Sequence, residues 1–320
     1  MYYTRVIQKS DQRIVSKVYP DIPPLEELGK NMSLVLINQY FPLTSPQLYS
    51  SNVVEVGGLH IGKKEPLLDQ ELKIFLDSAQ NGVVYISFGS LASNLPRKLI
   101  NAIMKLLTKS NIAFVWKTDV SYWDPPKNVF LGKWMPQVAV LCHPKVIGFI
   151  SHSGMLSTSE AVHCGVPIVS VPLFGDQFAN GRSVVESGIG VEVDILTVTE
   201  KGLQDALETI LQEKYYKKAK KLSQVWKDRP LSPMDTAVFW IEYVARNKGA
   251  VNMTPSTVDL SFYEYFLIDV LFVVVIVLSL VGIIILCAAK TALLLIRRMF
   301  LFKEHRVEGD TSNLLFNNDQ

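Results

Sequence analysis

The chain has 320 residues, of which 48% are apolar, and its formal net charge is +2. This length allows one large or two ordinary domains with a sizeable core, and the balanced charge argues against nucleic acid as a partner. No CxxC spacing is present, so the sequence predicts buried free thiols, rather than a metal site or a disulfide framework, at Cys142, Cys164 and Cys287.

The first 60 residues are too short for a domain of their own. The segment from Asp21 to Tyr40 contains one helix-to-strand unit at most, and the first ten residues lack an apolar stretch of signal-peptide length. A translocated domain with one C-terminal span usually follows such a signal. We therefore expect the chain to be a fragment, with residues 1–60 as the remnant of a preceding acceptor-binding domain and its linker.

Residues 81–213 alternate between short β-branched runs and helical patterns. The runs are mostly apolar on both faces, which is typical of parallel strands covered by helices. The alternation predicts an α/β fold with a doubly wound parallel sheet, in which ligands bind at the carboxyl ends of the strands. The predicted strands begin at Val83, Ala113, Val146, Pro167 and Gly190, and the predicted helices begin after Pro96, at Met155 and after Asp176.

Residues 214–249 contain two more predicted helices. The first carries a basic face, which is typical of a solvated surface. The second has start signals at Ser232 and Pro233 and a stop signal at Gly249. Together with these helices, the predicted ligand-binding domain covers residues 61–250.

An uninterrupted apolar stretch runs from Val270 to Ala289 and is long enough to cross a bilayer. We predict a transmembrane helix over residues 266–289, preceded by a juxtamembrane segment over residues 251–265. Basic residues follow the span and acidic residues precede it. The tail of residues 290–320 should therefore be cytosolic, and the long N-terminal part should be lumenal or extracellular.

The sequence Ser151-His152-Ser153-Gly154 follows a predicted strand and leads into a predicted helix. A glycine turn at a helix start offers free backbone N–H groups and the positive end of the helix dipole, which suit a diphosphate. His152 and Ser157 could add donors, and Glu160 could accept from ribose hydroxyls. Taken alone, the motif also fits an ordinary N-cap beside a surface histidine.

Three further groups follow strand ends. The turn at Ser90 could let the backbone approach a phosphate oxygen, although a plain turn fits as well. Asp176 and Gln177 suit sugar hydroxyls, or Asp176 simply caps a helix. Trp134 could stack on a flat base with Gln137 at the edge of that base, or it could belong to the core.

Several other site types are not predicted. The chain has no GxGxxG, no Walker sequence and no GxSxG elbow, and it has no HExxH or Cys/His ligand set. We therefore expect neither a bound dinucleotide nor a metal or other cofactor.

The segment from Leu131 to Gly181 resembles the signature of the UDP-glycosyltransferases, the family that includes the glucuronosyltransferases. The ordered set W-x-P-Q, HP, H-x-G, E, GVP and FGDQ carries the resemblance. It extends through "EVGGLH", "VVYISFGS" and "DRPLSPMDTAVFWIEYVARNKGA" over nearly the whole chain, and the wording is most similar to insect members. The resemblance implies a GT-B fold with two Rossmann-like domains, in which the C-terminal domain holds the donor.

The resemblance also implies a role for each matching position. Trp134 would stack on uracil and Gln137 would contact the nucleoside. Glu160 would bind the ribose, while Asp176 and Gln177 would bind the transferred sugar. Leu156 departs from the pattern, because plant relatives carry Asn there and many vertebrate relatives carry His. The diphosphate would be bound by Ser90, His152, Gly154, Ser157 and Thr158.

The activity implied is transfer of a hexose from UDP-glucose or UDP-glucuronate to a small lipophilic acceptor, with inversion and without metal. The family's catalytic His and its Asp would precede Met1, so we expect no catalytic base in this chain. The alternative is a truncated, non-catalytic UDP-sugar-binding membrane protein or a dimerisation partner of related transferases. The resemblance further implies a single-pass protein of the endoplasmic reticulum membrane that serves detoxification.

Overall fold

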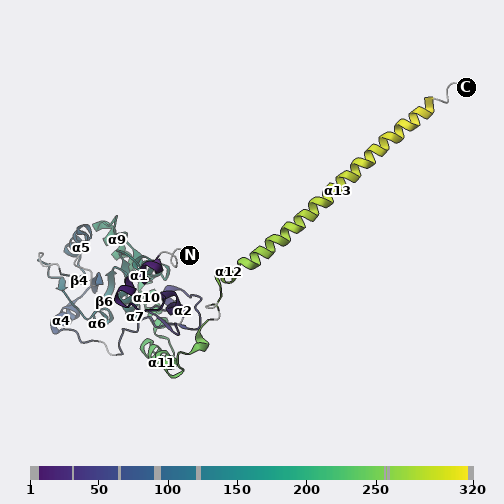
Figure 1. The fold of residues 1–320 in the computed structure, drawn as a ribbon. Helices are drawn as coiled ribbons and strands as arrows, with labels where there is room; N and C mark the ends of the chain where they lie inside the picture. Colours follow the sequence, from purple (N-terminus) through teal and green to yellow (C-terminus); the bar gives the residue numbers. More distant parts are fainter. Residues whose placement is uncertain are drawn as a thin grey trace. The chain divides into compact units, whose positions relative to one another are not determined.

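The computed structural model describes residues 7–30, 32–63, 66–89, 95–119, 124–255, 257 and 260–315. The chain divides into two units, Met1–Pro255 and Ser256–Gln320. Figure 1 shows the first unit as layers of helices around a sheet and the second as one long helix.

A six-stranded sheet forms the centre of the first unit, and every neighbouring pair of its strands is parallel. All five residues of the central strand β3 are buried. A strand that is apolar on both faces needs helices on both sides of the sheet, as the sequence predicts. The strand order is β5-β4-β3-β6-β7-β8, with β3 at Val83–Ser87, β4 at Ala113–Lys117, β5 at Val129–Gly132, β6 at Val146–Ser151, β7 at Ile168–Ser170 and β8 at Gly190–Glu192.

Helices cover both faces of this sheet, and alternate residues of the strands therefore belong to two separate cores. Tyr85 and Phe149 lie in one core with residues of α4, α6, α7, α8 and α10. Ile86 and Ile150 lie in the other core with residues of α5 and α9. The predicted doubly wound α/β fold is therefore confirmed. The helices are α4 (Gln70–Ser78), α5 (Arg97–Lys109), α6 (Gln137–Cys142), α7 (Met155–Cys164), α8 (Gln177–Glu186), α9 (Glu200–Ile210), α10 (Glu213–Lys227) and α11 (Pro233–Arg246).

The segment before the main sheet contributes a small parallel pair of strands. Tyr40 packs edge-on against Trp226 of α10, and Leu43 joins the core beneath α10. The guanidinium of Arg229 lies 3.5 Å from the centre of the Tyr40 ring. The elements are α1 (Gln8–Val18), α2 (Leu25–Lys30), β1 (Val35–Ile37), α3 (Phe41–Thr44) and β2 (Val53–Glu55).

The prediction of free thiols was wrong for two of the three cysteines. Cys142, the last residue of α6, and Cys164, the last residue of α7, form a disulfide with their Cα atoms 4.7 Å apart. A whole strand and turn separate them along the chain, so only the packing of α6 against α7 brings them together. Cys287 lies in the second unit and is free, as predicted, but it is exposed in the structure and not buried.

His163 lies in the last turn of α7 and is half-buried. Burial, and then the positive charges of Lys227, Arg229 and His60, lower its pKa to about 4. The folded protein therefore holds a neutral imidazole at a pH at which the unfolded chain, with a pKa of about 6.5, binds a proton.

We expect the free energy of unfolding to fall as the pH is lowered from about 6.5 to about 4, because the unfolded state takes up the proton first. His163→Gln should flatten the pH profile over that range. Urea unfolding at a series of pH values measures both profiles. Parallel profiles of the two proteins would show that His163 is not the group responsible.

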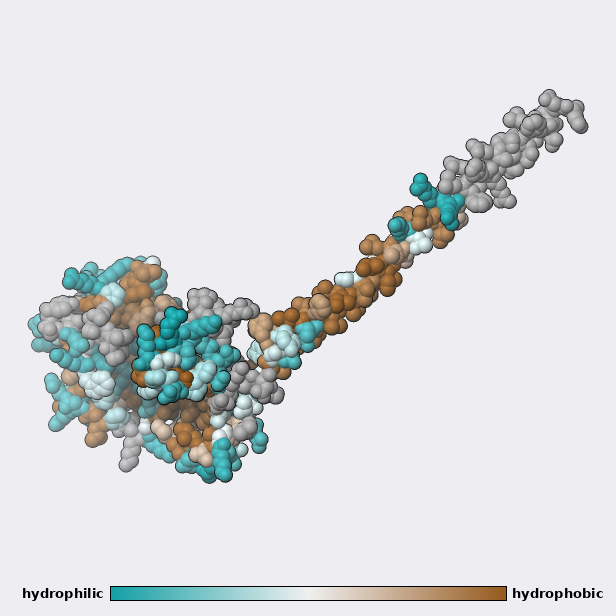
Figure 2. All heavy atoms as spheres, in the orientation of Figure 1, coloured by the Kyte–Doolittle hydropathy of each residue, from teal (hydrophilic) through white to brown (hydrophobic). Residues whose placement is uncertain are grey.

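The second unit consists of α12 (Phe262–Tyr265) and α13 (Ile268–Leu315). Ser261 and Glu264 form a capping box at the start of α12. The segment Ile268–Met299 of α13 is long and apolar enough to cross a membrane, and none of its most apolar window is buried in protein. Figure 2 shows a mainly hydrophobic surface along it, with hydrophilic patches toward its far end. This helix is the candidate single-pass anchor that the sequence predicts.

Candidate functional site

The carboxyl ends of β3 and β6 meet at the centre of the sheet. Counted from β3, the strand order is 3-2-1-4-5-6, and the direction of winding reverses between β3 and β6. Ligands of doubly wound sheets bind in the crevice at this reversal. The segments that follow these two strands, Phe88–Gly89 and His152–Gly154, therefore occupy the expected position of a ligand site.

The imidazole of His152 lies between two glycines. A Cβ atom at Gly154 would lie 2.6 Å from His152 Nε2, and a Cβ atom at Gly89 would lie 2.9 Å from it. Gly89 also has a φ of +72°, which favours glycine. Only glycine at both positions leaves room for the ring. Burial lowers the pKa of His152, against opposing contributions from the Ser87 backbone and Asp176.

The start of α7 is uncapped. Gly154 is its N-cap residue and makes no side-chain hydrogen bond to the first turn. The N–H of Thr158 is the first to bond within the helix, to the Gly154 carbonyl at 2.9 Å. The preceding N–H groups of this ten-residue helix are therefore available, together with the positive end of the helix dipole. This arrangement binds anions.

Ser153 holds the turn before α7 in an unusual shape. Its φ of +58° lies in the left-handed region, which costs a serine about 1 kcal/mol or more. Its hydroxyl donates to Ser170 Oγ at 2.7 Å, and its N–H donates to Ser151 Oγ at 3.1 Å. Asn180 Nδ2 donates to the Ser153 carbonyl at 3.0 Å. These buried bonds fix the turn that presents His152.

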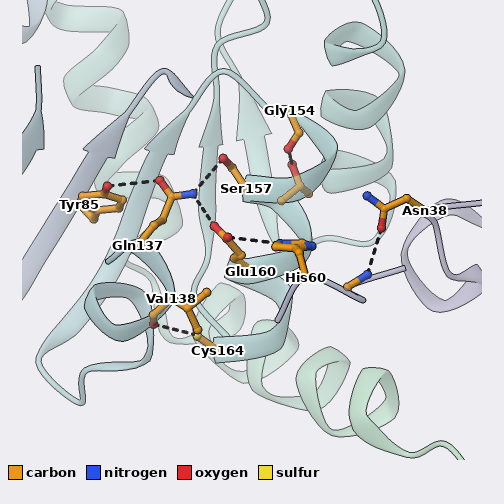
Figure 3. A network of polar contacts seen from close by, with 11 residues as sticks. Asn38, His60, Tyr85, Gln137, Val138, Gly154, Ser157, Glu160 and Cys164 are labelled. Carbon is orange, nitrogen blue, oxygen red and sulfur yellow. Dashed lines mark hydrogen bonds and ion pairs between the residues drawn. The ribbon is translucent and has the colours of Figure 1, made fainter. Parts of the chain in front are cut away.

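A polar network ties α6 to α7 beside this turn (Figure 3). Tyr85 Oη donates to Gln137 Oε1 at 3.2 Å, and Gln137 Nε2 donates to Ser157 Oγ at 2.9 Å and to Glu160 Oε2. The other oxygen of Glu160 lies 3.2 Å from His60 Nε2. Burial raises the pKa of Tyr85, so its phenol stays protonated and donates. The network orients the Gln137 amide and the Glu160 carboxylate.

Trp134 lies exposed at the carboxyl edge of the sheet. It follows β5, and it is 80% exposed, which contradicts the alternative that it belongs to the core. Lys117 Nζ, at the end of β4, lies 4.4 Å from the centre of its ring. Burial lowers the pKa of Lys117, while Glu160 and Asp119 raise it. A large indole exposed at the carboxyl edge of a sheet can stack on a flat ligand.

Asp176 and Gln177 are adjacent in the sequence but lie in different surroundings. Asp176 is exposed and makes no cap bond to α8, and it accepts a hydrogen bond from Asn180 Nδ2 at 2.9 Å. Gln177 is buried, and its Oε1 accepts from the N–H groups of Leu173 and Phe174 at 2.8 and 3.1 Å. Asp176 is thus available to a ligand, whereas the Gln177 oxygen shapes the loop.

The predicted site residues differ in where the fold places them. Thr158 is fully buried, and its hydroxyl donates to the Gly154 carbonyl at 3.0 Å, which does not favour a ligand contact. Ser90 lies outside the described residues. The residues that the fold brings to the carboxyl edge or its adjoining network are Trp134, Gln137, His152, Gly154, Ser157, Glu160 and Asp176.

Sequence reasoning missed three members of the site. Tyr85 lies in a buried strand and reads as an ordinary core residue, and Asn180 lies inside a helix. His60 belongs to the "EVGGLH" motif, which is part of the family resemblance but was given no role in the site. Within the part of the chain that the structure describes, no three His, Cys, Asp or Glu side chains gather where they could hold a metal ion.

Comparison with known proteins places the chain in a family. The family model for "UDP-glucoronosyl and UDP-glucosyl transferase" matches residues 1–306. UDP-glucosyltransferase 2 of Dactylopius coccus is 37% identical over 254 residues, which cover 78% of this chain and 49% of that protein. UDP-glucuronosyltransferase 1A3 of Rattus norvegicus is 36% identical over 288 residues, which cover 89% of this chain and 54% of that protein.

A solved structure shares the fold. The glycotransferase of kitacinnamycin aligns with a TM-score of 0.53 and 24% identity, over 66% of this chain and 54% of that one. The chain spans about half the length of the curated relatives it matches, with 49% and 54% of the two named above.

Proposed function

The chain belongs to the UDP-glucoronosyl and UDP-glucosyl transferase family, and on that premise we propose that it binds the UDP-sugar donor at the carboxyl edge of its sheet. The single observation that carries the proposal is the uncapped start of α7 beside His152, whose ring fits only because Gly89 and Gly154 lack side chains. The proposed donor is UDP-glucose or UDP-glucuronate.

Each part of the donor has a proposed partner. The diphosphate lies at the N–H groups of α7, with His152 and Ser157 as further donors. Uracil stacks on Trp134, and Gln137 contacts the nucleoside. The Glu160 carboxylate accepts from ribose hydroxyls with the lone pairs that Gln137 and His60 leave open. Asp176 accepts from hydroxyls of the hexose.

The proposed reaction is transfer with inversion, without a metal ion. The acceptor oxygen forms a bond to the anomeric carbon while the bond from that carbon to the diphosphate breaks, and the proton of the acceptor hydroxyl passes to water or to a base outside this chain. Negative charge grows on the departing UDP, and the dipole and N–H groups of α7 stabilise it more in the transition state than in the ground state. We assign no general base to this chain, and the proposed acceptor is a small lipophilic alcohol.

Without a base, turnover by this chain alone should be lower by about 10²–10⁴-fold than in a complete enzyme. A chain that binds UDP-glucose but shows no transfer would favour the second candidate, a non-catalytic binding protein or a partner of related transferases.

We further propose a single-pass protein of the endoplasmic reticulum membrane, with the first unit in the lumen and a role in detoxification. The disulfide between Cys142 and Cys164 supports an oxidising compartment for the first unit. The basic residues Lys290, Arg297 and Arg298 at the far end of the apolar segment favour a cytosolic tail.

The test is calorimetric titration of the full chain, in a neutral detergent, with UDP, UDP-glucose and UDP-glucuronate. His152→Ala should weaken binding of all three by about 10-fold or more, because it removes a hydrogen bond to a charged group. His143→Ala is the matched control, since His143 precedes β6 at the opposite edge of the sheet. Equal affinities of the two variants would refute the proposed site.

Trp134→Ala should weaken UDP binding by about 5- to 100-fold, because stacking of a base on an aromatic ring contributes about 1–3 kcal/mol. The free energy of unfolding should stay within about 0.5 kcal/mol, since the side chain is 80% exposed. Tyr216→Ala, an exposed aromatic residue on α10, is the control for both measurements. Unchanged affinity for UDP after removal of the indole would place the base elsewhere.

A further inference from the structure

A second hollow lies away from the start of α7. It has a volume of about 510 Å³ and is lined by the loop after β2, by His163, and by the segment that joins α10 to α11. His163 and Met155 stand at opposite ends of α7, about 12 Å apart at 1.5 Å per residue. The hollow is therefore separate from the proposed diphosphate position.

Three cationic side chains line this hollow. They are Lys63, Lys227 and Arg229; the imidazoles of His60 and His163 also line it, and no carboxylate belongs to the described lining residues. Lys63 is paired with Asp235 at 3.0 Å. Lys227 forms no ion pair with a described residue, so its charge is available.

Arg229 is held in place as part of the wall. Its Nη1 donates to the Gly57 carbonyl at 2.9 Å and its Nε donates to the Trp226 carbonyl at 2.8 Å. Its Nη2 is buried and has no hydrogen-bond partner among the described residues. The charge of Arg229 thus adds to the field in the hollow without being neutralised by a hydrogen-bonded carboxylate.

The pKa of His163 reports this field. After burial, the positive charges of Lys227 and Arg229 contribute most to lowering it, so two cationic side chains act on one wall of the hollow. Ser232 and Pro233 begin the 14-residue helix α11 and also line the hollow, but the Ser232 hydroxyl caps this helix start and Asp235 lies in its first turn, so the positive charge of the hollow comes from the side chains.

The rest of the lining is apolar. Trp226 lines one side, and Leu231 and Met234 line another with about half of their surfaces exposed. A hollow with a large apolar surface and a few convergent charges is the usual form of a small-molecule site. Its chemistry differs from the polar turn that precedes α7.

We propose that this hollow binds an amphipathic anion, with a phosphate, sulfate or carboxylate group at Lys227 and Arg229 and an aromatic or aliphatic body against Trp226, Leu231 and Met234. The His60–Glu160 ion pair forms a direct contact between a residue of this lining and the polar network of α7. A ligand here would therefore lie next to, and not in, the proposed donor site.

Phenyl phosphate is the probe for this proposal, titrated calorimetrically into the full chain in neutral detergent with UDP present at saturation. We expect Lys227→Met to weaken its binding by about 3- to 10-fold, as for one partly exposed charge pair. Lys221→Met is the matched control, because Lys221 is exposed on α10 and does not line the hollow. Phenol and inorganic phosphate should each bind more weakly than phenyl phosphate.

Histidine NMR gives a second readout that does not depend on any variant. Bound phosphate should raise the pKa of His163, because an anion offsets the positive charges around it. Hexyl phosphate in place of phenyl phosphate distinguishes a lipid-like source from an aromatic one. Equal affinities of the two lysine variants, together with an unmoved His163 pKa, would overturn the proposal, as would binding of phenyl phosphate that is seen only when UDP is left out.

Discussion

Gly154→Ala is expected to remove most of the affinity for the UDP-sugar while the protein stays folded. The new Cβ would lie 2.6 Å from His152 Nε2, so the imidazole must leave the crevice. The backbone at Gly154, with φ of −60° and ψ of 139°, is one that alanine adopts without strain. Loss of one charge-assisted hydrogen bond corresponds to about 10- to 100-fold in affinity.

Calorimetric titration with UDP-glucose measures this effect, and circular dichroism checks the fold. Gly29→Ala is the matched control, because no atom lies within 4 Å of a Cβ at Gly29. In a His152→Ala background, Gly154→Ala should have little further effect, since the ring it displaces is already absent. Wild-type affinity in the single variant would mean that the imidazole does not touch the donor.

Replacing both Cys142 and Cys164 with serine is expected to lower the free energy of unfolding by about 3 kcal/mol. The disulfide closes a loop between residues 22 positions apart, and its removal gives the unfolded chain more freedom. For a unit of this size, about 2–4 °C per kcal/mol corresponds to a drop in Tm of about 6–12 °C.

Differential scanning calorimetry with and without dithiothreitol measures the change. The reductant should lower the Tm of the wild type and leave that of the double variant unchanged. Cys287→Ser is the control, because this cysteine is free and exposed on α13. A double variant with the wild-type Tm would show that Cys142 and Cys164 are reduced in the isolated protein.

Regular local patterns made much of the fold predictable. The helix Met155–Cys164 begins where the sequence predicts it, directly after Gly154, and Gly165 ends it in the left-handed conformation of a helix stop. The buried strands were recognisable because they are apolar on both faces. The order of the strands was not predicted, because short-range spacing does not determine which strands become neighbours.

The contacts that assemble the site could not be predicted in the same way. Tyr85 and Gln137 are 52 positions apart, and their hydrogen bond depends on β3 lying beside the start of α6. His60 and Glu160 come from different elements, and no spacing rule relates a loop to a helix so far along the chain. The disulfide was missed for the same reason, since 22 residues separate its partners.

The apolar part of α13 is longer than the hydrocarbon core of a bilayer is thick. At 1.5 Å per residue, Ile268–Met299 measures about 48 Å, against a hydrocarbon thickness of about 30 Å. Tilt alone would have to reach about 50°, beyond the usual range of about 0–40°. Asp269 and Lys290 bracket twenty uncharged residues, which match the hydrocarbon. These two charges, and not the apolar length, would set the depth of the anchor, and Thr291–Met299 would lie among the lipid headgroups.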